Sequence, residues 1–263
     1  MNKTYISIVL ILFLCQAGCG GKEDDNTVNI ATAANMQYAM QALSEYYRDS
    51  TGVNCQLIIG SSGKLSAQIK EGAPFDIFVA ANMKYPEEVE RMGLAEESPK
   101  VYAYGTLVLL TVQEGIAASL EILHTDAVSH IALANPKTAP YGEAAVEVLN
   151  RYGLYEAVKD KLVYGESISQ ANQFILSGAA ELGFTSLSVV LSPQMKQRGN
   201  WIPIGQELYS PIEQGVVLLR NKEARGSAAK GFYKFLFSRK AAEILKKFGY
   251  SVNEPPAMQD RQN

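Results

Sequence analysis

The sequence predicts an α/β protein of two lobes, each built on a mostly parallel sheet flanked by helices. Short apolar runs alternate with stretches of helical periodicity along most of the chain, which is typical of strands joined by crossover helices. Two longer apolar segments, 101–112 and 214–219, suit strands that cross from one lobe to the other and back. A helix end, a Gly-Ala pair, an acidic residue and a strand occur at 69–79 and again at 175–185. Alone this repeated pattern also fits two unrelated turns. Together with two strands that cross between the lobes, it favours two related lobes.

The N-terminal segment has the features of a lipoprotein signal peptide. Lys3 supplies a positive charge, and the apolar run at 5–14 is too short to span a bilayer as a stable helix. The small residues that end at Cys19 resemble a bacterial lipobox, although Gln16 stands where an aliphatic residue is usual. We expect residues 1–18 to be removed, the Cys19 thiol to carry lipid, and the protein to be anchored outside the cytoplasm. An ordinary secretory signal with an incidental cysteine is the alternative.

The first lobe is expected to follow a polar tether at 19–27 and to comprise residues 28–105 and 206–250. Its strands are predicted at 28–31, 53–59 and 77–80, and its helices at 36–46, 65–70 and 86–92. One or two further helices over 228–248 are expected to return and pack on this lobe.

The second lobe is expected to comprise residues 106–205, and residues 251–263 to form a C-terminal tail. The elements predicted in this lobe are strands at 131–134 and 182–185 and helices at 143–152 and 170–176.

Cysteine usage excludes an internal disulfide and a thiolate metal cluster. Of the three cysteines, Cys15 leaves with the signal peptide and Cys19 is acylated, so Cys55 remains alone. Cys55 alternates with Val53 and Leu57 in a strand-like run, and we expect it to be a small core residue.

The charge and the motifs of the chain favour a binding protein over an enzyme. The formal net charge of −3, or −4 without the positive charge of Lys3, argues against a nucleic-acid partner and offers no long-range attraction for an anion. No Gly-x-Ser-x-Gly, Walker or His-Glu-x-x-His motif occurs, and the two histidines, His124 and His130, have no evident acidic partner. We therefore expect neither catalysis nor a cofactor.

Four short segments each combine a strand end, a loop of small residues and a helix start, at 31–35, 60–64, 135–142 and 165–169. A helix start exposes unpaired N–H groups and the positive end of the helix dipole. In open α/β sheets ligands bind outside the carboxyl ends of the strands, so we expect these loops to converge on an anion. None of them contains an arginine, which predicts a site of neutral donors suited to holding and releasing a small oxyanion.

Single residues in these loops have a functional and a structural interpretation. Asn35 and Ser62 can add a side-chain donor to their backbone N–H. Pro140 restrains a turn in which Tyr141 and Gly142 present their N–H groups. Each of these residues could equally be a helix cap or a core residue. Their shared place at strand ends favours a ligand site.

Charged residues near the loops are not expected to touch the anion. Lys64 and Lys137 lie beside the loops and are expected to be solvated. Asp76 and Glu181 are expected to brace loops as hydrogen-bond acceptors, because a carboxylate that faces an anion would repel it.

At these same residues the chain resembles the molybdate-binding proteins that serve ATP-driven importers, within the extracytoplasmic solute-binding proteins. The resemblance extends from about residue 28 to residue 250, nearly all of the mature chain. Its segments are Ala-Ala-Asn-Met (33–36), Gly-Ser-Ser-Gly-Lys-Leu (60–65), Gly-Ala-Pro-Phe-Asp-Ile-Phe (72–78), Ala-Asn-Pro-Lys-Thr-Ala-Pro-Tyr-Gly (134–142), Ala-Glu-Leu-Gly-Phe (180–184) and Phe-Gly-Tyr (248–250). Each is weak alone, but their order and spacing are specific.

This resemblance implies a type II periplasmic-binding-protein fold whose lobes close on molybdate or tungstate in the cleft between them. It implies ligand donors at Asn35, Ser62, Tyr141 and Ile168, the last two mainly through backbone N–H, with Ser61 and Ser186 as weaker candidates. Molybdenum would enter only as the oxyanion, with no direct bond to the protein. The implied partners are a permease and its ATPase, and the protein is expected to be a monomer. Sulfate or phosphate is the alternative ligand.

Overall fold

The computed structural model describes residues 26–195, 198–220 and 226–252. The predicted signal peptide, Cys19 and the tail beyond Val252 lie outside the described residues. Within the described ranges no helix is both long and apolar enough to cross a membrane.

The described chain folds around two five-stranded sheets, which confirms the predicted two-lobed α/β architecture. The first sheet has the strand order β2-β1-β3-β10-β4 and the second β7-β6-β8-β5-β9. In each sheet one strand, β10 or β5, runs antiparallel to both of its neighbours, and the other four strands share one direction. The strands of the first sheet are β1 (Thr27–Ala33), β2 (Asn54–Gly60), β3 (Ile77–Ala80), β4 (Lys100–Gly105) and β10 (Ile212–Leu218). Those of the second are β5 (Leu107–Thr111), β6 (Ile131–Ala134), β7 (Leu162–Gly165), β8 (Leu182–Ser186) and β9 (Asn200–Pro203).

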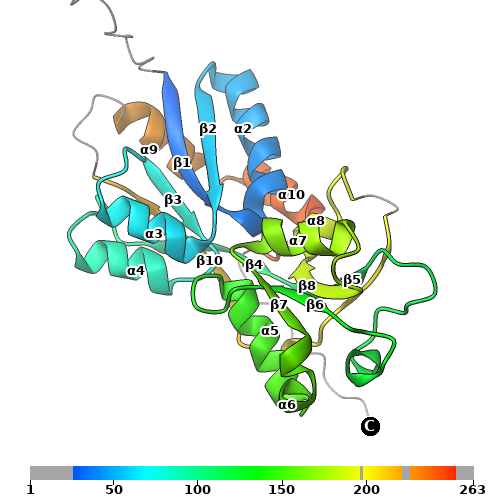
Figure 1. Cartoon of the computed structure of the whole chain (residues 1–263). Coiled ribbons are helices and arrows are strands. Elements are labelled where there is room, and N and C mark those ends of the chain that lie inside the picture. The colour runs from blue at the N-terminus through cyan, green and yellow to red at the C-terminus, as the bar shows by residue number, and fades with distance from the viewer. Residues whose placement is uncertain (1–25, 196–197, 221–225, 253–263) are drawn as a thin grey trace, which may run out of the picture.

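Helices cover both faces of the first sheet, because its strands alternate their apolar side chains between two cores (Figure 1). Ile30 and Val79 face the core under α2 (Gln37–Thr51), α9 (Gly226–Phe235) and α10 (Arg239–Lys247). Ala31 and Phe78 face the core under α3 (Ser62–Lys70) and α4 (Lys84–Arg91).

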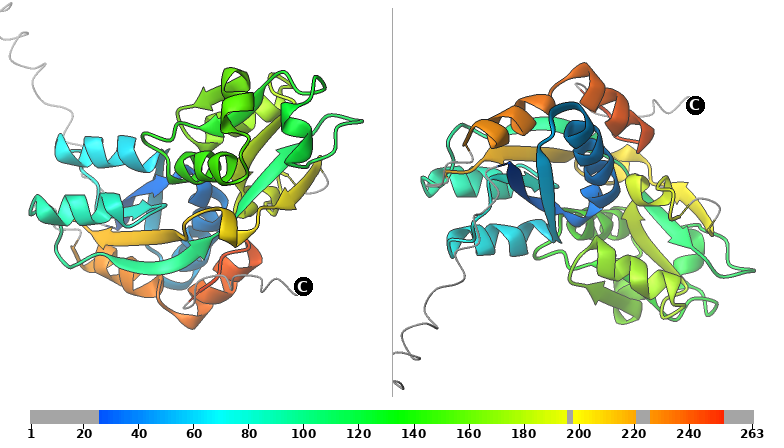
Figure 2. Two further views of the ribbon diagram at one scale, coloured as in Figure 1. Left: turned by 90° about the horizontal axis from the view of Figure 1, so that it is seen from below. Right: turned by 90° about the horizontal axis from the view of Figure 1, so that it is seen from above.

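The helices of the second lobe share one large core with its sheet. These helices are α5 (Pro140–Arg151), α6 (Tyr155–Val158), α7 (Ile168–Leu176) and α8 (Leu187–Val190). Short 3-10 turns lie at Ala34–Met36, Glu121–His124, Lys159–Lys161 and Gln206–Leu208. The two lobes stand side by side in both views of Figure 2, one mainly blue and orange, the other green and yellow.

The chain crosses between the sheets at two places. The first crossing lies in the segment 101–112, as the sequence predicts, but the return lies between β9 and β10, ahead of the predicted segment 214–219, most of which belongs to β10 of the first sheet. The first crossing is two strands rather than one, because β4 ends at Gly105 in the first sheet and β5 begins at Leu107 in the second. The second passes from β9 through the turn Gln206–Leu208 into β10. Both crossings lie beside the ends of strands that carry the predicted loops, so the site and the hinge between the lobes are neighbours.

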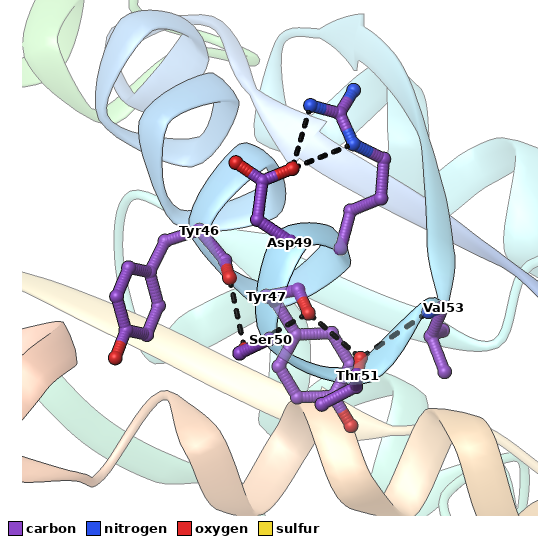
Figure 3. Close-up of polar contacts among 7 residues, drawn as sticks. Tyr46, Tyr47, Asp49, Ser50, Thr51 and Val53 are labelled. Carbon is purple, nitrogen blue, oxygen red and sulfur yellow. Dashed lines mark hydrogen bonds and ion pairs between the residues drawn. The ribbon is translucent and has the colours of Figure 1, made fainter.

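The end of α2 shows how a helix is stopped before an edge strand (Figure 3). Ser50 Oγ donates to the carbonyl of Tyr46, and Thr51 Oγ1 donates to that of Tyr47, at 2.9 and 2.7 Å. Gly52 then adopts a φ of 75°, which favours glycine, and the Val53 N–H donates to Thr51 Oγ1. The last carbonyls of the helix are satisfied and β2 starts two residues later. On β2, the free thiol of Cys55 is partly buried against the α2 side of the core, and burial raises its pKa to about 11.

The three helices that follow the second, third and fourth predicted loops begin two or three residues earlier than the sequence predicts. They begin at Ser62, Pro140 and Ile168 rather than at 65, 143 and 170. Their first turns consist largely of small and polar residues, so the apolar periodicity becomes visible only in the second turn. The difference matters because it puts three of the predicted donors inside a first helical turn.

Candidate anion-binding site

A small pocket lies between the two lobes, where loops from both sheets meet. Four of its nine lining residues are the predicted donors Asn35, Ser62, Tyr141 and Ile168, and a fifth is Ser61. The others are small and apolar: Ala34, Ala81, Ala139 and Pro140. The cavity is small, with a volume of about 10 Å³. That is the room of one small solute rather than of an organic molecule.

The four predicted donors come from the starts of four different helical turns. Ser62 and Ile168 are the first residues of α3 and α7, Tyr141 is the second of α5, and Asn35 is the second of a 3-10 turn. N–H groups at these positions have no acceptor within their own helix. All four residues are at most 4% exposed. The expected convergence of the four loops is therefore observed.

The two serines of the second loop differ in how their hydroxyls are used. Ser62 Oγ accepts a hydrogen bond of 3.0 Å from the Ala81 N–H, which leaves the Ser62 hydroxyl proton free to be donated. Ser61 Oγ is buried without a partner among the described residues. Both hydroxyls are therefore available as donors to a bound anion, in addition to the backbone N–H of Ser62.

The side chain of Asn35 differs from the expectation that it adds a donor to the pocket. Its Nδ2 donates to Gln214 Oε1 at 2.7 Å and to the Tyr250 hydroxyl at 3.0 Å. This orientation is fixed, because Gln214 Nε2 donates to the Ile212 carbonyl and so must turn its oxygen to Asn35. Both amide hydrogens point away from the pocket, and Asn35 can serve an anion only through its backbone N–H.

Tyr141 forms a neutral wall of the pocket. Burial raises the pKa of its hydroxyl well above the usual value, so the side chain stays uncharged. The hydroxyl reaches Gly105 at the first crossing, where an added Cβ would collide with it. Among the described residues it has no hydrogen-bond partner. What Tyr141 offers to an anion is its N–H at the helix start.

Ser186 does not line the pocket. It is fully buried at the end of β8, and its hydroxyl shares a hydrogen bond of 3.0 Å with that of Ser188. Its place beside the first loop, rather than facing the pocket, suits a supporting role.

The charged residues that the sequence places near the loops do not line the pocket, as the sequence predicts. Every residue that lines it is uncharged. Lys64 Nζ pairs with Glu166 Oε1 at 2.6 Å, and both side chains are about half exposed. Asp76 Oδ2 accepts from the Asn29 N–H at 2.8 Å, and Glu181 Oε2 accepts from two N–H groups, so both carboxylates brace loops as expected.

The histidines play no part at this site. Glu181 Oε2 lies 4.0 Å from His130 Nδ1, an acidic neighbour that the sequence did not indicate. This pair stands at the beginning of β8, the opposite strand end from the pocket. In the described ranges no group of three or more His, Cys, Asp or Glu side chains is placed to hold a metal ion.

The lobes touch each other around the pocket. The Gly63 N–H donates to the Thr138 carbonyl at 2.9 Å, and the Tyr85 hydroxyl donates to the Lys137 carbonyl at 3.2 Å. On the hinge side, Ser188 Oγ donates to the Asn35 carbonyl at 2.5 Å. These contacts enclose the pocket, so the structure has the geometry of a closed state.

Three polar residues that hydrogen-bond to Asn35 are missing from the sequence-based site: Ser188, Gln214 and Tyr250. Tyr250 stands in the Phe-Gly-Tyr segment on which the family resemblance partly rests, and Gln214 is a polar residue in an apolar crossing strand. These two features of the sequence could have marked Tyr250 and Gln214 as candidates. Ser188 carries no such signal.

Comparisons with known proteins agree with this geometry. Residues 28–251 match the family model described as bacterial extracellular solute-binding protein. The molybdate-binding protein ModA of Azotobacter vinelandii is 40% identical over 227 residues, covering 86% of this chain and 90% of that protein. That of Rhodobacter capsulatus is 36% identical over 246 residues, covering 93% and 94%. The solved structure of the Azotobacter vinelandii periplasmic molybdate-binding protein superposes with a TM-score of 0.81 at 32% identity, over 86% of this chain and 100% of that one.

Proposed function

The chain belongs to the bacterial extracellular solute-binding protein family, and from this premise we propose that it captures molybdate for an ABC importer. The type II fold, with the candidate site between the lobes, is that of a binding protein rather than an enzyme. The observation that carries the ligand assignment is the enclosed, uncharged pocket ringed by four helical starts.

Such a pocket suits a doubly charged oxyanion. Removing a dianion from water costs tens of kcal/mol in the idealised limit, and each charge-assisted hydrogen bond returns about 1.5–3 kcal/mol. Several donors are needed, and they must already be oriented. The N–H groups of Asn35, Ser62, Tyr141 and Ile168 and the hydroxyls of Ser61 and Ser62 supply them.

The lining also bears on which oxyanion is bound. Hydrogen phosphate carries a proton that needs an acceptor, and no carboxylate is present among the residues that line the pocket. Sulfate carries no proton and differs from molybdate mainly in size, so the spacing of the donors has to discriminate between them. Tungstate, similar to molybdate in size and charge, is expected to bind as well. Sulfate or phosphate remains the alternative ligand.

The remaining parts of the assignment rest on the sequence and the family. We propose that Cys19 carries a lipid that holds the protein at the outer face of a membrane, and that the protein works as a monomer. A permease with its ATPase is the proposed recipient of the anion. We propose lobe boundaries at 28–105 with 206–250 and at 106–205, a division supported by the grouping of the strands into two sheets.

Isothermal titration calorimetry with molybdate, tungstate, sulfate, phosphate and chromate tests the proposal. We expect one molybdate or tungstate per chain and much weaker heats with the other three anions. Bound molybdate is also expected to raise the melting temperature with its concentration, because it binds only the folded state. Tighter binding of sulfate or phosphate than of molybdate would replace the proposed ligand by the alternative.

A further inference from the structure

Behind the pocket lies a buried polar cluster, here called the hinge cluster, made of Asn35, Ser188, Gln214 and Tyr250. Its members come from the loop after β1, from α8, from β10 and from the segment after α10. All four are at most 3% exposed. Segments far apart in the chain thus meet at one point beside both crossings between the lobes.

The hydrogen bonds of the cluster converge on Asn35. Its Nδ2 is held by Gln214 and by the Tyr250 hydroxyl, and its carbonyl accepts from Ser188 Oγ at 2.5 Å and lies 3.0 Å from the Tyr250 hydroxyl. Since Ser188 gives its proton to that carbonyl, Ser186 is the donor in the bond between the two serines. The side chain and the carbonyl of Asn35 are both fixed, which leaves its N–H as the group turned to the pocket.

Tyr250 is itself firmly placed. Gly249 turns the chain with a φ of 77°, and Ser251 forms two backbone hydrogen bonds with Tyr104 of β4, at 2.8 and 3.0 Å. Burial raises the pKa of the Tyr250 hydroxyl far above its usual value, so it remains a neutral donor. The C-terminal segment therefore brings one rigid hydroxyl to the back of the first loop.

We propose that Ser188 and Tyr250 are positioning residues for anion binding, which act through Asn35 and do not touch the anion. This inference rests on the proposed function. Tyr250 fixes the direction of the Asn35 backbone from within the first lobe. Ser188 lies on α8, after β8 of the second sheet, so its bond to the Asn35 carbonyl joins the two lobes, and we expect it to tie closure to the placement of a ligand donor.

The test compares Tyr250→Phe and Ser188→Ala with matched controls. Tyr233→Phe removes a hydroxyl from a tyrosine that is equally buried on α9, and Ser192→Ala removes one from a fully buried serine close to Ser188 in sequence. Neither control hydroxyl has a partner among the described residues, and neither residue lines the pocket. Molybdate affinity is measured by calorimetry, and rate constants by stopped-flow or surface-based kinetics.

We expect Tyr250→Phe and Ser188→Ala each to raise the molybdate Kd about five- to tenfold, the effect of losing one hydrogen bond. For Ser188→Ala the change is expected in the dissociation rate constant, with an almost unchanged association rate constant, because the lost bond joins the two lobes. The double variant should lose less than the product of the two effects, since both hydroxyls act on one carbonyl. Both controls should bind as the wild type does.

The inference is overturned if both variants bind molybdate with wild-type affinity, or if the controls lose as much as they do. A loss of melting temperature without any change in Kd would assign the cluster a purely structural role. If the wild-type protein itself binds none of the five anions, the proposed function fails, and the positioning role fails with it.

Discussion

Ser62 shows how one neutral side chain can serve an anion. Its oxygen accepts from the Ala81 N–H, so the hydroxyl proton is free to be donated to an anion in the pocket that Ser62 lines. The same residue offers a backbone N–H at the first position of α3. Two donors from one residue make Ser62 the most informative position to change.

Replacing Ser62 by alanine is expected to raise the molybdate Kd about 10- to 100-fold, because a hydrogen bond to a charged group contributes about 1.5–3 kcal/mol. Unfolding stability should fall by only about 1 kcal/mol, for the loss of the Ala81 partner. Calorimetry and thermal melting measure the two effects. The control is Ser66→Ala on the same helix, where the serine is 1% exposed and its hydroxyl has no partner in the described structure. Equal affinities of the two variants would remove the Ser62 side chain from the site.

The pH dependence of binding follows from the uncharged lining. Burial raises the pKa of Tyr141, which keeps this hydroxyl protonated even above pH 10, and the other lining residues do not titrate. Molybdate affinity is therefore expected to stay constant from about pH 6 to about pH 9. Calorimetry across this range checks it. A tenfold fall between about pH 6 and about pH 9 would indicate that a cation that loses its proton in this range, such as a histidine, holds the anion.

At the scale of single residues, the sequence predicts which positions line the site but not how each is used. Ser62, Tyr141 and Ile168 are accessible to prediction because a helix start is a local pattern. The direction of the Asn35 side chain is not, because its partners Gln214 and Tyr250 lie 179 and 215 positions away. Only the folded chain brings them to it.

At the scale of elements, the start of α3 also has to pass close to the other lobe. Gly63 is in contact with the second lobe through its N–H and the Thr138 carbonyl. A Cβ on Gly63 would lie 3.0 and 3.1 Å from the Cα and Cβ of Thr138 and 2.9 Å from the Tyr85 hydroxyl. Glycine at this position therefore permits closure.

The variant Gly63→Ala is expected to separate stability from binding. Alanine is favoured over glycine in a helix by up to about 1 kcal/mol, so the ligand-free protein should be as stable as the wild type or slightly more so. The molybdate Kd should nevertheless rise about tenfold, because the added methyl group holds the lobes apart. Calorimetry measures the change in the molybdate Kd, and thermal melting of the ligand-free protein measures the change in stability. Gly226→Ala, at a helix start where no atom of the described residues lies within 4 Å of the added Cβ, is the control.

Elements are predicted well where they carry periodicity and poorly where they do not. The helix α2 and the strand β6 follow clear apolar patterns. The first turns of α3, α5 and α7 lack such a pattern, so the sequence predicts the starts of these helices two or three residues too late. The edge strands β7 and β9, which expose much of their surface, carry no alternation that predicts them. Ligand-binding turns are short and polar, so the signal is weakest where function is concentrated.

At the scale of the whole molecule, the sequence predicts two lobes whose loops converge on one site, but not the bonds by which the lobes touch. The contacts between them are a few polar bonds, such as Gly63 to Thr138 and Ser188 to Asn35, and no periodic pattern announces such bonds. The bonds that join the closed lobes are therefore a finding of the structure. It explains why a pocket so small can hold its ligand and yet release it when the lobes part.

The ion pair between Lys64 and Glu166 links the lobes beside the pocket, but both groups are about half exposed. Such pairs contribute little and are screened by salt. We expect Glu166→Gln to change the molybdate Kd less than about threefold. The control Glu156→Gln breaks a comparable exposed pair with Lys159 away from the pocket. A loss of molybdate affinity as large as that of Ser62→Ala would mean that anion binding depends on this ion pair.

The most direct test is a crystal structure of the molybdate complex, with the metal located by its anomalous scattering. We predict the molybdenum peak between the lobes, with oxygens within hydrogen-bond distance of the N–H groups of Asn35, Ser62, Tyr141 and Ile168 and no lysine or arginine in contact. A peak elsewhere, or an anion held by Lys64 or Lys137, would contradict the account.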